Sequence, residues 1–398
     1  MLFERWTDIL AITGIIAEFN PLHLGHKLLI DEAKKLNKPV AAVISGNFVQ
    51  RGECAVFEKE LRTKCALKAG VDIVAELPVL WSMSTAQNFA LGGVWQLYSI
   101  GCDEIIFGSE CGDIERLLYT ADILCSDMFF SRLTERVNDA ITFASAREAV
   151  AVSLGADKSI LNSPNDNLGL EYIIAAKKLN LPMNFRCIKR QGAGHDSKFV
   201  SGDFVSSSMI REELSHDNIA FAERFMPGYL HGIIKEENIA DNTRLETAVL
   251  AVLRTKSAKD FLHLPDISEG LENRLEFAIR SAKNLLELQA QLKSKRYTLA
   301  RVRRIIMSAF LGFDNSFFMK TPPYTRLLGV SEKGLDILSK GVMYDILTKP
   351  AQIKALGADA QKVFDTECRA TDIYTLALKV PLEAGLEYKR KFLKSEDL

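Results

Sequence analysis

Two histidines three positions apart, His23 and His26, are the residues of this sequence whose types and spacing most clearly favour chemistry. They belong to residues 18–26, EFNPLHLGH, which join an apolar run typical of a strand to a segment typical of a helix. Histidines at this spacing share one face of a first helical turn, where free backbone N–H groups and the positive end of the helix dipole also point. Gly25 lets a ligand approach the backbone closely. The segment therefore predicts a polyphosphate site, in which imidazoles stabilise charge that develops on phosphoryl oxygens.

The spacing of the two histidines leaves two other interpretations open. Histidines three apart can bind a metal ion, although the sequence places no further His or Cys nearby to complete such a site. They can also stand at the start of a helix that has no further role. We expect no protein-bound metal here.

A second group of hydroxyl and cationic side chains lies far downstream, in residues 205–211, VSSSMIR. Serines just before a helix are typical N-caps, and that role alone would explain them. If the same sheet brings this helix beside the histidines, Ser207, Ser208 and Arg211 can instead hold the outer phosphates of a polyphosphate. Both interpretations stay open at this point.

The elements that must position these residues alternate between strands and helices. Apolar runs typical of buried strands are separated by segments with helical spacing, and the strands are expected at residues 12–17, 40–44, 71–76, 104–107 and 182–188. This rhythm with short links predicts an α/β fold, a parallel sheet covered by helices. Such sheets bind ligands beyond the carboxyl ends of their strands, where both motifs would lie.

The pattern changes after residue 225, and strand-like runs become rare. Long helical stretches are expected at residues 244–253, 269–292 and 298–311. We therefore expect two domains, an α/β domain over residues 1–236 and a mainly α-helical domain over residues 237–398.

Composition excludes several classes of protein. The 398 residues include 47% hydrophobic and 25% charged residues, as in ordinary globular proteins, and the net charge of -1 argues against a strongly basic nucleic-acid coat protein. The seven cysteines are scattered and form no C-x-x-C pair, which is typical of reduced thiols in a cytosol, so we expect a cytoplasmic protein. No segment approaches the ~20 apolar residues of a membrane helix. We therefore expect no membrane association.

The two motifs together resemble the nucleotidylyltransferase superfamily, in which H-x-G-H follows the first strand of a Rossmann-like sheet and a late S-S-[ST]-x-I-R motif begins a helix. A narrower set of segments resembles the bacterial tRNA(Met) cytidine acetate ligase family, from about Gly14 to Leu328. These segments are EFNP at 18–21, SGNFVQRGE at 45–53, ELP at 76–78, FGSE at 107–110, SPNDNLG at 163–169 and KRYT at 295–298.

The resemblance implies an activity with two substrates besides RNA. Members of this family activate acetate with ATP and acetylate the wobble cytidine of elongator tRNA(Met), which gives N4-acetylcytidine. We therefore expect ATP as a substrate, together with Mg²⁺, for which Glu18 and Asp72 could be ligands through water. The identity of the acid rests on the resemblance alone, and the sequence leaves the oligomeric state open.

The resemblance also implies an ATP site in residues 16–29 and at three later positions. His23, His26 and Arg211 would be catalytic, with the histidines at the α- and β-phosphates. The residues expected to bind ATP are Ile16, Ala17, Glu18, Phe19, Asn20, Pro21, His23, Gly25, His26, Leu29, Gly108, Asn165, Arg190, Ser207 and Ser208. Gly108 ends an expected strand, where a ring or ribose can approach closely.

Basic residues in two places are candidates for RNA contact. Arg51 lies in a loop that follows the second strand, and Lys59, Arg62 and Lys64 predict a basic surface beside it. The densest basic segment follows residue 292, and its expected RNA-binding residues are Lys295, Arg296, Arg301, Arg303 and Arg304. An ordinary solvated helix face is the alternative for each of these residues.

Two other functions are compatible with the sequence. A small-molecule adenylyltransferase, which transfers AMP to a phosphorylated metabolite, would share the first domain but would not need a basic helical domain. A tRNA-binding module with a vestigial nucleotide site is the other, and the intact His23, Gly25, His26 and Arg211 argue against it.

Overall fold

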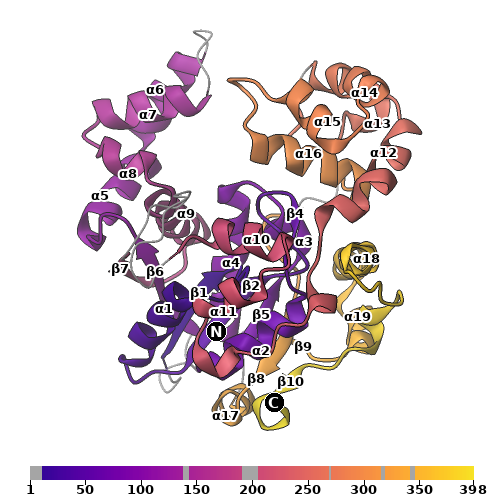
Figure 1. Ribbon diagram of the computed structural model, residues 1–398. Helices are drawn as coiled ribbons and strands as arrows, with labels where there is room; N and C mark the ends of the chain where they lie inside the picture. The colour runs from indigo at the N-terminus through magenta and orange to yellow at the C-terminus, as the bar shows by residue number, and fades with distance from the viewer. Residues whose placement is uncertain (1–10, 138–142, 191–204, 269, 315–318, 341–345) are drawn as a thin grey trace.

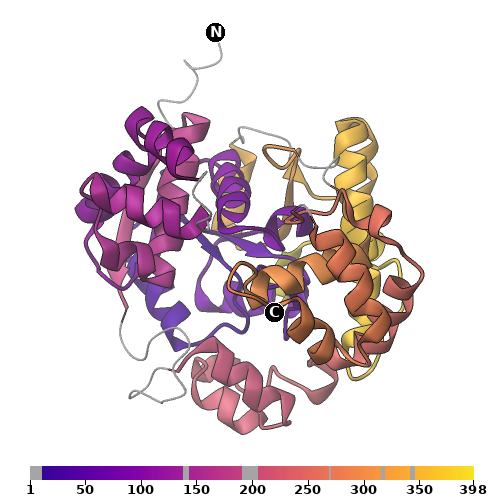
Figure 2. The ribbon, with the colours of Figure 1, turned by 90° about the horizontal axis from the view of Figure 1, so that it is seen from above.

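The computed structural model describes residues 11–137, 143–190, 205–268, 270–314, 319–340 and 346–398. A sheet lies at the centre of the molecule, and two separate groups of helices extend above it in Figure 1. Seen from above, these two groups lie on either side of the central strands (Figure 2). Among the helices of the described residues, none is long and apolar enough to cross a membrane.

Five parallel strands form the core of the sheet, as expected from the sequence. Their spatial order is β5-β2-β1-β6-β7, so β1 is central. Their bounds are Ile12–Ala17 for β1, Val40–Ser45 for β2, Ile73–Leu77 for β5, Cys102–Ser109 for β6 and Asn184–Lys189 for β7. The α/β fold class is therefore confirmed.

Helices cover both faces of this sheet because its strands are apolar on both sides. In β2, Val40, Ala42 and Ile44 belong to one core, and Ala41 and Val43 belong to the other. The first core is covered by α1 (Leu24–Lys34), α2 (Lys59–Ala69), α10 (Ser207–Ser215) and α11 (Ile219–Arg224). The second is covered by α4 (Ala86–Ile100) and α9 (Pro164–Leu179), with the short α3 (Val79–Ser82) before α4.

The first group of helices is inserted between β6 and β7. It consists of α5 (Ile114–Cys125), α6 (Asp127–Val137), α7 (Phe143–Ser153) and α8 (Lys158–Asn162), and it continues into α9. Helical spacing in the sequence predicts helices at residues 113–125 and 168–179, which agree with α5 and the later part of α9, but it predicts none of the helices between them. This group forms the upper left of Figure 1.

The second group, which we call the helical lobe, follows residue 240. It contains α12 (Glu246–Arg254), α13 (Ala258–Phe261), α14 (Leu271–Ser281), α15 (Leu285–Leu292) and α16 (Leu299–Leu311). The helix expected over 269–292 is in fact two helices, because the chain leaves helical geometry at Ala282 and Asn284 caps a new helix by accepting from the Glu287 N–H.

The chain returns to the sheet after the helical lobe, which the sequence did not predict. β8 (Thr325–Val330) pairs antiparallel with β5, and β9 (Ile346–Leu347) and β10 (Leu393–Lys394) pair with β8. The helices of this part are α17 (Glu332–Ser339), α18 (Ala358–Tyr374) and α19 (Leu386–Lys389). Residues 237–398 are therefore mainly helical but not helical throughout. β8 is only six residues long and largely buried, so it lacks the alternation of an amphipathic strand.

A small hairpin follows β2 and joins the sheet to the helical lobe. Its strands are β3 (Phe48–Val49) and β4 (Glu53–Cys54), and we call residues 46–55 the hairpin. Phe48 is fully buried in the apolar core of the helical lobe. At the tip, Gly52 adopts a φ of 75°, and a Cβ there would lie 2.5 Å from the backbone nitrogen of Arg304 in α16. The hairpin tip therefore packs directly against α16.

Candidate active site

A cavity of about 250 Å³ lies beyond the carboxyl ends of β1, β6 and β7. Almost all residues that the sequence predicted for an ATP site line this cavity. Those that line it are Ile16, Ala17, Glu18, Phe19, Asn20, His23, Gly25, His26, Leu29, Gly108, Asn165, Arg190, Ser207, Ser208 and Arg211. Pro21 is buried and is not among the lining residues. Residues 191–204, which follow β7, lie outside the described residues.

His23 joins the two motifs that the sequence places 184 residues apart. It is the N-cap of α1, and its Nδ1 accepts the Gly25 N–H at 3.0 Å. Because Nδ1 is an acceptor, a neutral His23 carries its proton on Nε2, which lies 2.9 Å from Ser207 Oγ. Burial, reinforced by Arg190 and Arg211, lowers the pKa of His23 to about 3. His23 is therefore a neutral donor at physiological pH.

His26 repeats this arrangement one turn later. Its Nδ1 accepts the backbone N–H of His23 at 3.4 Å, and its ring stacks on that of His23 with centroids 3.9 Å apart. The ring of Phe19 meets it edge-on at 5.2 Å. Burial and the neighbouring His23 lower the pKa of His26 well below its usual value. Two neutral imidazoles with Nε2–H groups therefore stand at the start of α1.

The serine motif divides its roles among three hydroxyl groups. Ser206 is the N-cap of α10, since its hydroxyl accepts the Met209 N–H at 3.3 Å. The N-cap interpretation is thus correct for Ser206, whereas Ser207 contacts His23. Arg211 donates to the Asn20 carbonyl at 2.8 Å and to Ser208 Oγ at 3.4 Å. The N-termini of α1 and α10 consequently face the same cavity.

Gly108, Asn165 and Arg190 lie on the β6–β7 side of the cavity. Arg190 Nη1 is 3.5 Å from Asn165 Oδ1, and a Cβ on Gly108 would meet the Arg190 side chain at 3.4 Å. Glu110 accepts both the backbone and the side-chain N–H groups of Asn165. Glu110 belongs to the FGSE segment, but the sequence predicted no role for it. Its partners show that it positions Asn165.

Asp166, a buried residue next to Asn165, holds the residues that follow β6 in place. It is 1% exposed, and its carboxylate accepts from the Ser109 hydroxyl and from the backbone N–H groups of Glu110 and Cys111. Asp166 belongs to the segment SPNDNLG at 163–169, but no motif predicted this role for it. The contact ties the end of β6 to the start of α9.

The hairpin forms the wall on the other side of β1. Val49, Gln50, Arg51 and Glu53 line the cavity there. Glu18 accepts the Gln50 N–H at 2.9 Å, which connects the end of β1 to the hairpin. Lys189 and the aromatic residues Phe89 and Tyr172 also line the cavity, although the sequence motifs predicted none of them. Of these, Lys189 could have been found from its position beside Arg190 at the end of β7.

The two expected carboxylate ligands of Mg²⁺ lie at opposite ends of parallel strands. Glu18 follows β1 and lines the cavity, whereas Asp72 precedes β5. Asp72 accepts the Val40 N–H and the Ser331 hydroxyl, so its role is structural. Within the part of the chain that the structure describes, no group of three or more His, Cys, Asp or Glu side chains could hold a metal ion.

The basic surface predicted near the hairpin is wrong for Lys59 and Arg62. These side chains are 2% and 1% exposed. Arg62 donates to the carbonyl oxygens of Glu18 and Ser45 at 2.8 Å each and also to that of Gly46. It therefore holds the ends of β1 and β2 together, where it satisfies carbonyl groups that the strands leave unpaired.

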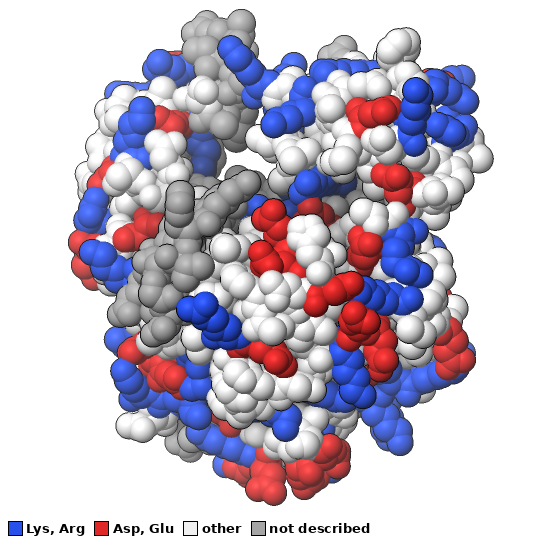
Figure 3. Space-filling view, in the orientation of Figure 1, with Lys and Arg blue, Asp and Glu red and all other residues white. Residues whose placement is uncertain are grey.

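The basic residues of α16 have partners within the protein. Arg303 pairs with Glu53 of the hairpin, and Arg304 pairs with Asp266 at 2.7 Å. Arg301 donates to the Asp266 carbonyl at 2.7 Å and lies over the Tyr297 ring. Lys295 and Arg296, in contrast, are exposed. Figure 3 shows Lys and Arg side chains on the helical lobe and a hollow between this lobe and the other helical group.

The sheet, the histidine pair at the start of α1 and the serine–arginine pair at the start of α10 define the class of nucleotidyl transferases. The family model described as HIGH Nucleotidyl Transferase matches residues 10–387.

Curated relatives narrow this class. The tRNA(Met) cytidine acetate ligase of Caldanaerobacter subterraneus subsp. tengcongensis is 39% identical over 96% of this chain and 99% of the relative. That of Thermoanaerobacter sp. is 37% identical over 97% of this chain and 100% of the relative. The chain belongs to the tRNA(Met) cytidine acetate ligase family, as its motifs predicted.

Solved structures agree with this assignment. Thermotoga maritima TmcAL bound with alpha-thio ATP matches with a TM-score of 0.88 and 28% identity, over 97% of this chain and 99% of that one. The apo form of the same protein matches with a TM-score of 0.90 and 29% identity, with the same coverage. The expected nucleotidylyltransferase-like fold is therefore confirmed.

Proposed function

We propose that this protein uses ATP to activate acetate and transfers the acetyl group to the wobble cytidine of elongator tRNA(Met). The observation that carries the proposal is the convergence of two helix N-termini, two neutral histidines and Arg211 on one cavity. The identities of the acid and of the RNA are inferred from the family to which the chain belongs. The charge and the donors of the cavity fit a nucleoside triphosphate, since Arg190, Arg211 and Lys189 line it together with three N-terminal serines of α10.

In the first step, an acetate oxygen attacks the α-phosphorus of ATP, and pyrophosphate leaves. His23 and His26 would donate their Nε2–H groups to the α- and β-phosphates as negative charge develops there. Ser207, Ser208 and Arg211 would hold the outer phosphates, while Gly108, Asn165 and Arg190 would receive the adenosine. Mg²⁺ would enter with the phosphates of ATP, and Glu18 is the lining carboxylate nearest in sequence to the histidines.

In the second step, the cytidine N4 amine attacks the carbonyl carbon of acetyl-adenylate. The new N–C bond replaces the anhydride C–O bond, AMP leaves, and the amine loses a proton.

The two parts of the chain would have different roles in this reaction. Residues 1–236 would carry out the chemistry, and the helices of 237–398 would contact the RNA, in the cytoplasm where tRNA is found. The RNA phosphates would be contacted by Lys295, Arg296 and Arg51. Because Arg301, Arg303 and Arg304 have partners within the protein, they would mainly orient the RNA-binding surface.

Acetate-dependent exchange of pyrophosphate into ATP tests the first step directly. The protein would be incubated with ATP, Mg²⁺ and labelled pyrophosphate, with and without acetate, in the absence of RNA. The proposal predicts exchange only with acetate. Exchange that needs a phosphorylated metabolite instead would identify a small-molecule adenylyltransferase, and the absence of all exchange would favour an RNA-binding module.

A further inference from the structure

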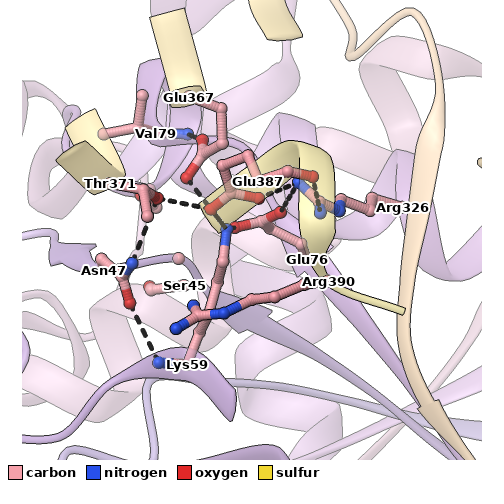
Figure 4. A network of polar contacts seen from close by, with 12 residues as sticks. Ser45, Asn47, Lys59, Glu76, Val79, Arg326, Glu367, Thr371, Glu387 and Arg390 are labelled. Atoms are coloured by element: carbon pink, nitrogen blue, oxygen red, sulfur yellow. Dashed lines mark hydrogen bonds and ion pairs between the residues drawn. The ribbon is translucent and has the colours of Figure 1, made fainter. Parts of the chain in front are cut away.

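A buried set of charged and polar residues lies under the hairpin, away from the candidate active site. Lys59 contacts Glu76 and Glu387, and Arg326 also pairs with Glu387 (Figure 4). The four side chains are at most 8% exposed. They come from α2, β5, β8 and α19, so the end of the chain meets its first half here.

A chain of hydrogen bonds, which we call the relay, connects this cluster to the hairpin. Each group along it donates toward Glu387. Lys59 and Arg326 outweigh the effect of burial and lower the pKa of Glu387 to about 2, so this carboxylate only accepts. The Thr371 hydroxyl must therefore donate to Glu387. Its oxygen then accepts from Asn47 Nδ2 at 3.1 Å, and Asn47 Oδ1 accepts the Lys59 N–H at 2.9 Å. The orientation of the Asn47 amide is thus fixed from α18 and α19.

Asn47 in turn closes the base of the hairpin. Its carbonyl accepts the Ala55 N–H at 2.9 Å, and the Ala55 carbonyl accepts from the Tyr374 hydroxyl of α18 at 3.0 Å. Behind Asn47, a Cβ on Gly46 would lie 2.7 Å from Glu367 Oε1 and 2.8 Å from Glu76 Oε1. The base of the hairpin is therefore held between the buried cluster and α18.

The place of the hairpin in the sheet indicates which step it serves. The spatial order β2-β1-β6-β7 puts the hairpin on one side of β1. Gly108 lies near the end of β6 and Arg190 follows β7, both on the other side of β1, where adenosine is expected. The hairpin also contacts α16 through Gly52 and through the pairing of Glu53 with Arg303. It thus lies between the cavity and the lobe that carries the exposed basic residues.

We infer that the hairpin is the wall of the active site against which the acetyl-accepting cytidine is placed, and that Thr371 is a positioning residue for this wall through Asn47. This inference rests on the proposed function. Thr371 touches no substrate. It acts on acetyl transfer through the position of Gln50 and Arg51, while Glu110 and Asp166 hold the β6–β7 side of the cavity, where adenosine is expected.

A comparison of two buried threonines on one helix tests the inference. Thr371→Val removes both hydrogen bonds of the relay with little change of shape. Thr366→Val is the matched control, because the Thr366 hydroxyl donates to the Lys362 carbonyl within α18. Thr371→Ser restores the hydroxyl. Each variant is assayed for acetate-dependent pyrophosphate exchange, for tRNA acetylation over a range of tRNA concentrations, and for amide hydrogen exchange of residues 46–55.

The inference predicts that Thr371→Val lowers kcat/KM for tRNA by roughly tenfold or more while pyrophosphate exchange stays within about twofold, because misplacing a positioning group costs up to about a hundredfold. Amide exchange in 46–55 becomes faster in this variant alone, and Thr371→Ser behaves as the wild type. Unchanged tRNA acetylation, or parallel loss of both steps, would overturn the inference. If the wild type itself fails to acetylate tRNA, the proposed function is wrong. In that case the amide exchange still tests the relay, because unchanged exchange in Thr371→Val would contradict the positioning role of Thr371.

Discussion

His23 Nε2 lies 2.9 Å from Ser207 Oγ, so the first turn of α1 meets the first turn of α10 across 184 residues of sequence. This contact makes one donor-lined site out of two motifs. Neutral imidazoles, helix N-termini and Arg211 supply hydrogen bonds and positive charge without a nucleophilic side chain. The site is therefore suited to stabilising charge on a leaving pyrophosphate.

Replacing His26 by Ala should lower the rate of acetate-dependent pyrophosphate exchange by roughly a hundredfold to a thousandfold, the usual effect of removing one preorganised donor. The measurement is kcat/KM for ATP in the exchange assay. His216→Ala, at an exposed position, is the control and should leave the rate unchanged. Turnover of His26→Ala at the wild-type rate would show that His26 does not stabilise the transition state.

The stability of the protein should fall as the pH drops below the usual histidine pKa of about 6.5. The folded state holds His23 neutral with its pKa lowered to about 3, whereas the unfolded chain takes up a proton below 6.5. The contribution of His23 is thus complete above about pH 6.5 and decreases by up to about 1.4 kcal/mol per pH unit toward pH 3. Urea unfolding at pH 7.5, 6.5 and 5.5 measures this slope. His23→Gln should make the slope shallower, and an identical slope in both proteins would contradict the assigned pKa.

Asp166→Asn should destabilise the protein by about 2 kcal/mol, because the amide cannot accept all the hydrogen bonds that the buried carboxylate accepts. Asp113→Asn is a matched control, since Asp113 caps α5 and Asn caps helices equally well. Denaturant unfolding of both variants measures the difference. Equal stability of the two variants would show that the contacts between β6 and α9 contribute little.

Exposed Lys295 and Arg296 should add phosphate contacts to tRNA binding. Changing both to Gln should weaken binding and reduce the magnitude of the slope of log K against log salt by up to about 1.8, since each phosphate that a cation neutralises contributes ~0.7–0.9 to this slope. The control, Lys333→Gln with Lys340→Gln, removes the same charge from α17 and its C-cap residue, and α17 lies at the opposite end of the molecule (Figure 1). Titrations of tRNA at salt concentrations from about 50 to about 200 mM distinguish the two pairs. Identical slopes would show that the segment around Arg296 is a solvated face.

Much of the α/β part could be predicted because its signals are local. The strand Ile12–Ala17 agrees with its predicted bounds, and the histidine motif follows it as expected. Buried parallel strands are continuous apolar runs, which the sequence displays directly. The side chains of the motif then need only the shared edge of the sheet to come together. The family resemblance supplied Gly108, Asn165 and Arg190, which local pattern alone would not have joined to this edge.

The features that could not be predicted from the sequence depend on contacts between distant parts of the chain. Arg62 and Lys59 have the helical spacing of a basic surface, yet they are buried because Glu387, Glu76 and several carbonyl groups surround them. Nothing in the local sequence indicates these partners, since Glu387 lies near the opposite end of the chain. β8 was missed for the same reason, because its place beside β5 is decided by the sheet rather than by its six residues.

The proposed function requires that ATP, acetate and tRNA meet in this one cavity. Its decisive test is incubation of the protein with ATP, Mg²⁺, labelled acetate and total bacterial tRNA, followed by nucleoside analysis of the RNA. The expected result is label in N4-acetylcytidine at the wobble position of elongator tRNA(Met), with AMP formed in equal amount. AMP formation without label in RNA would contradict the proposed function.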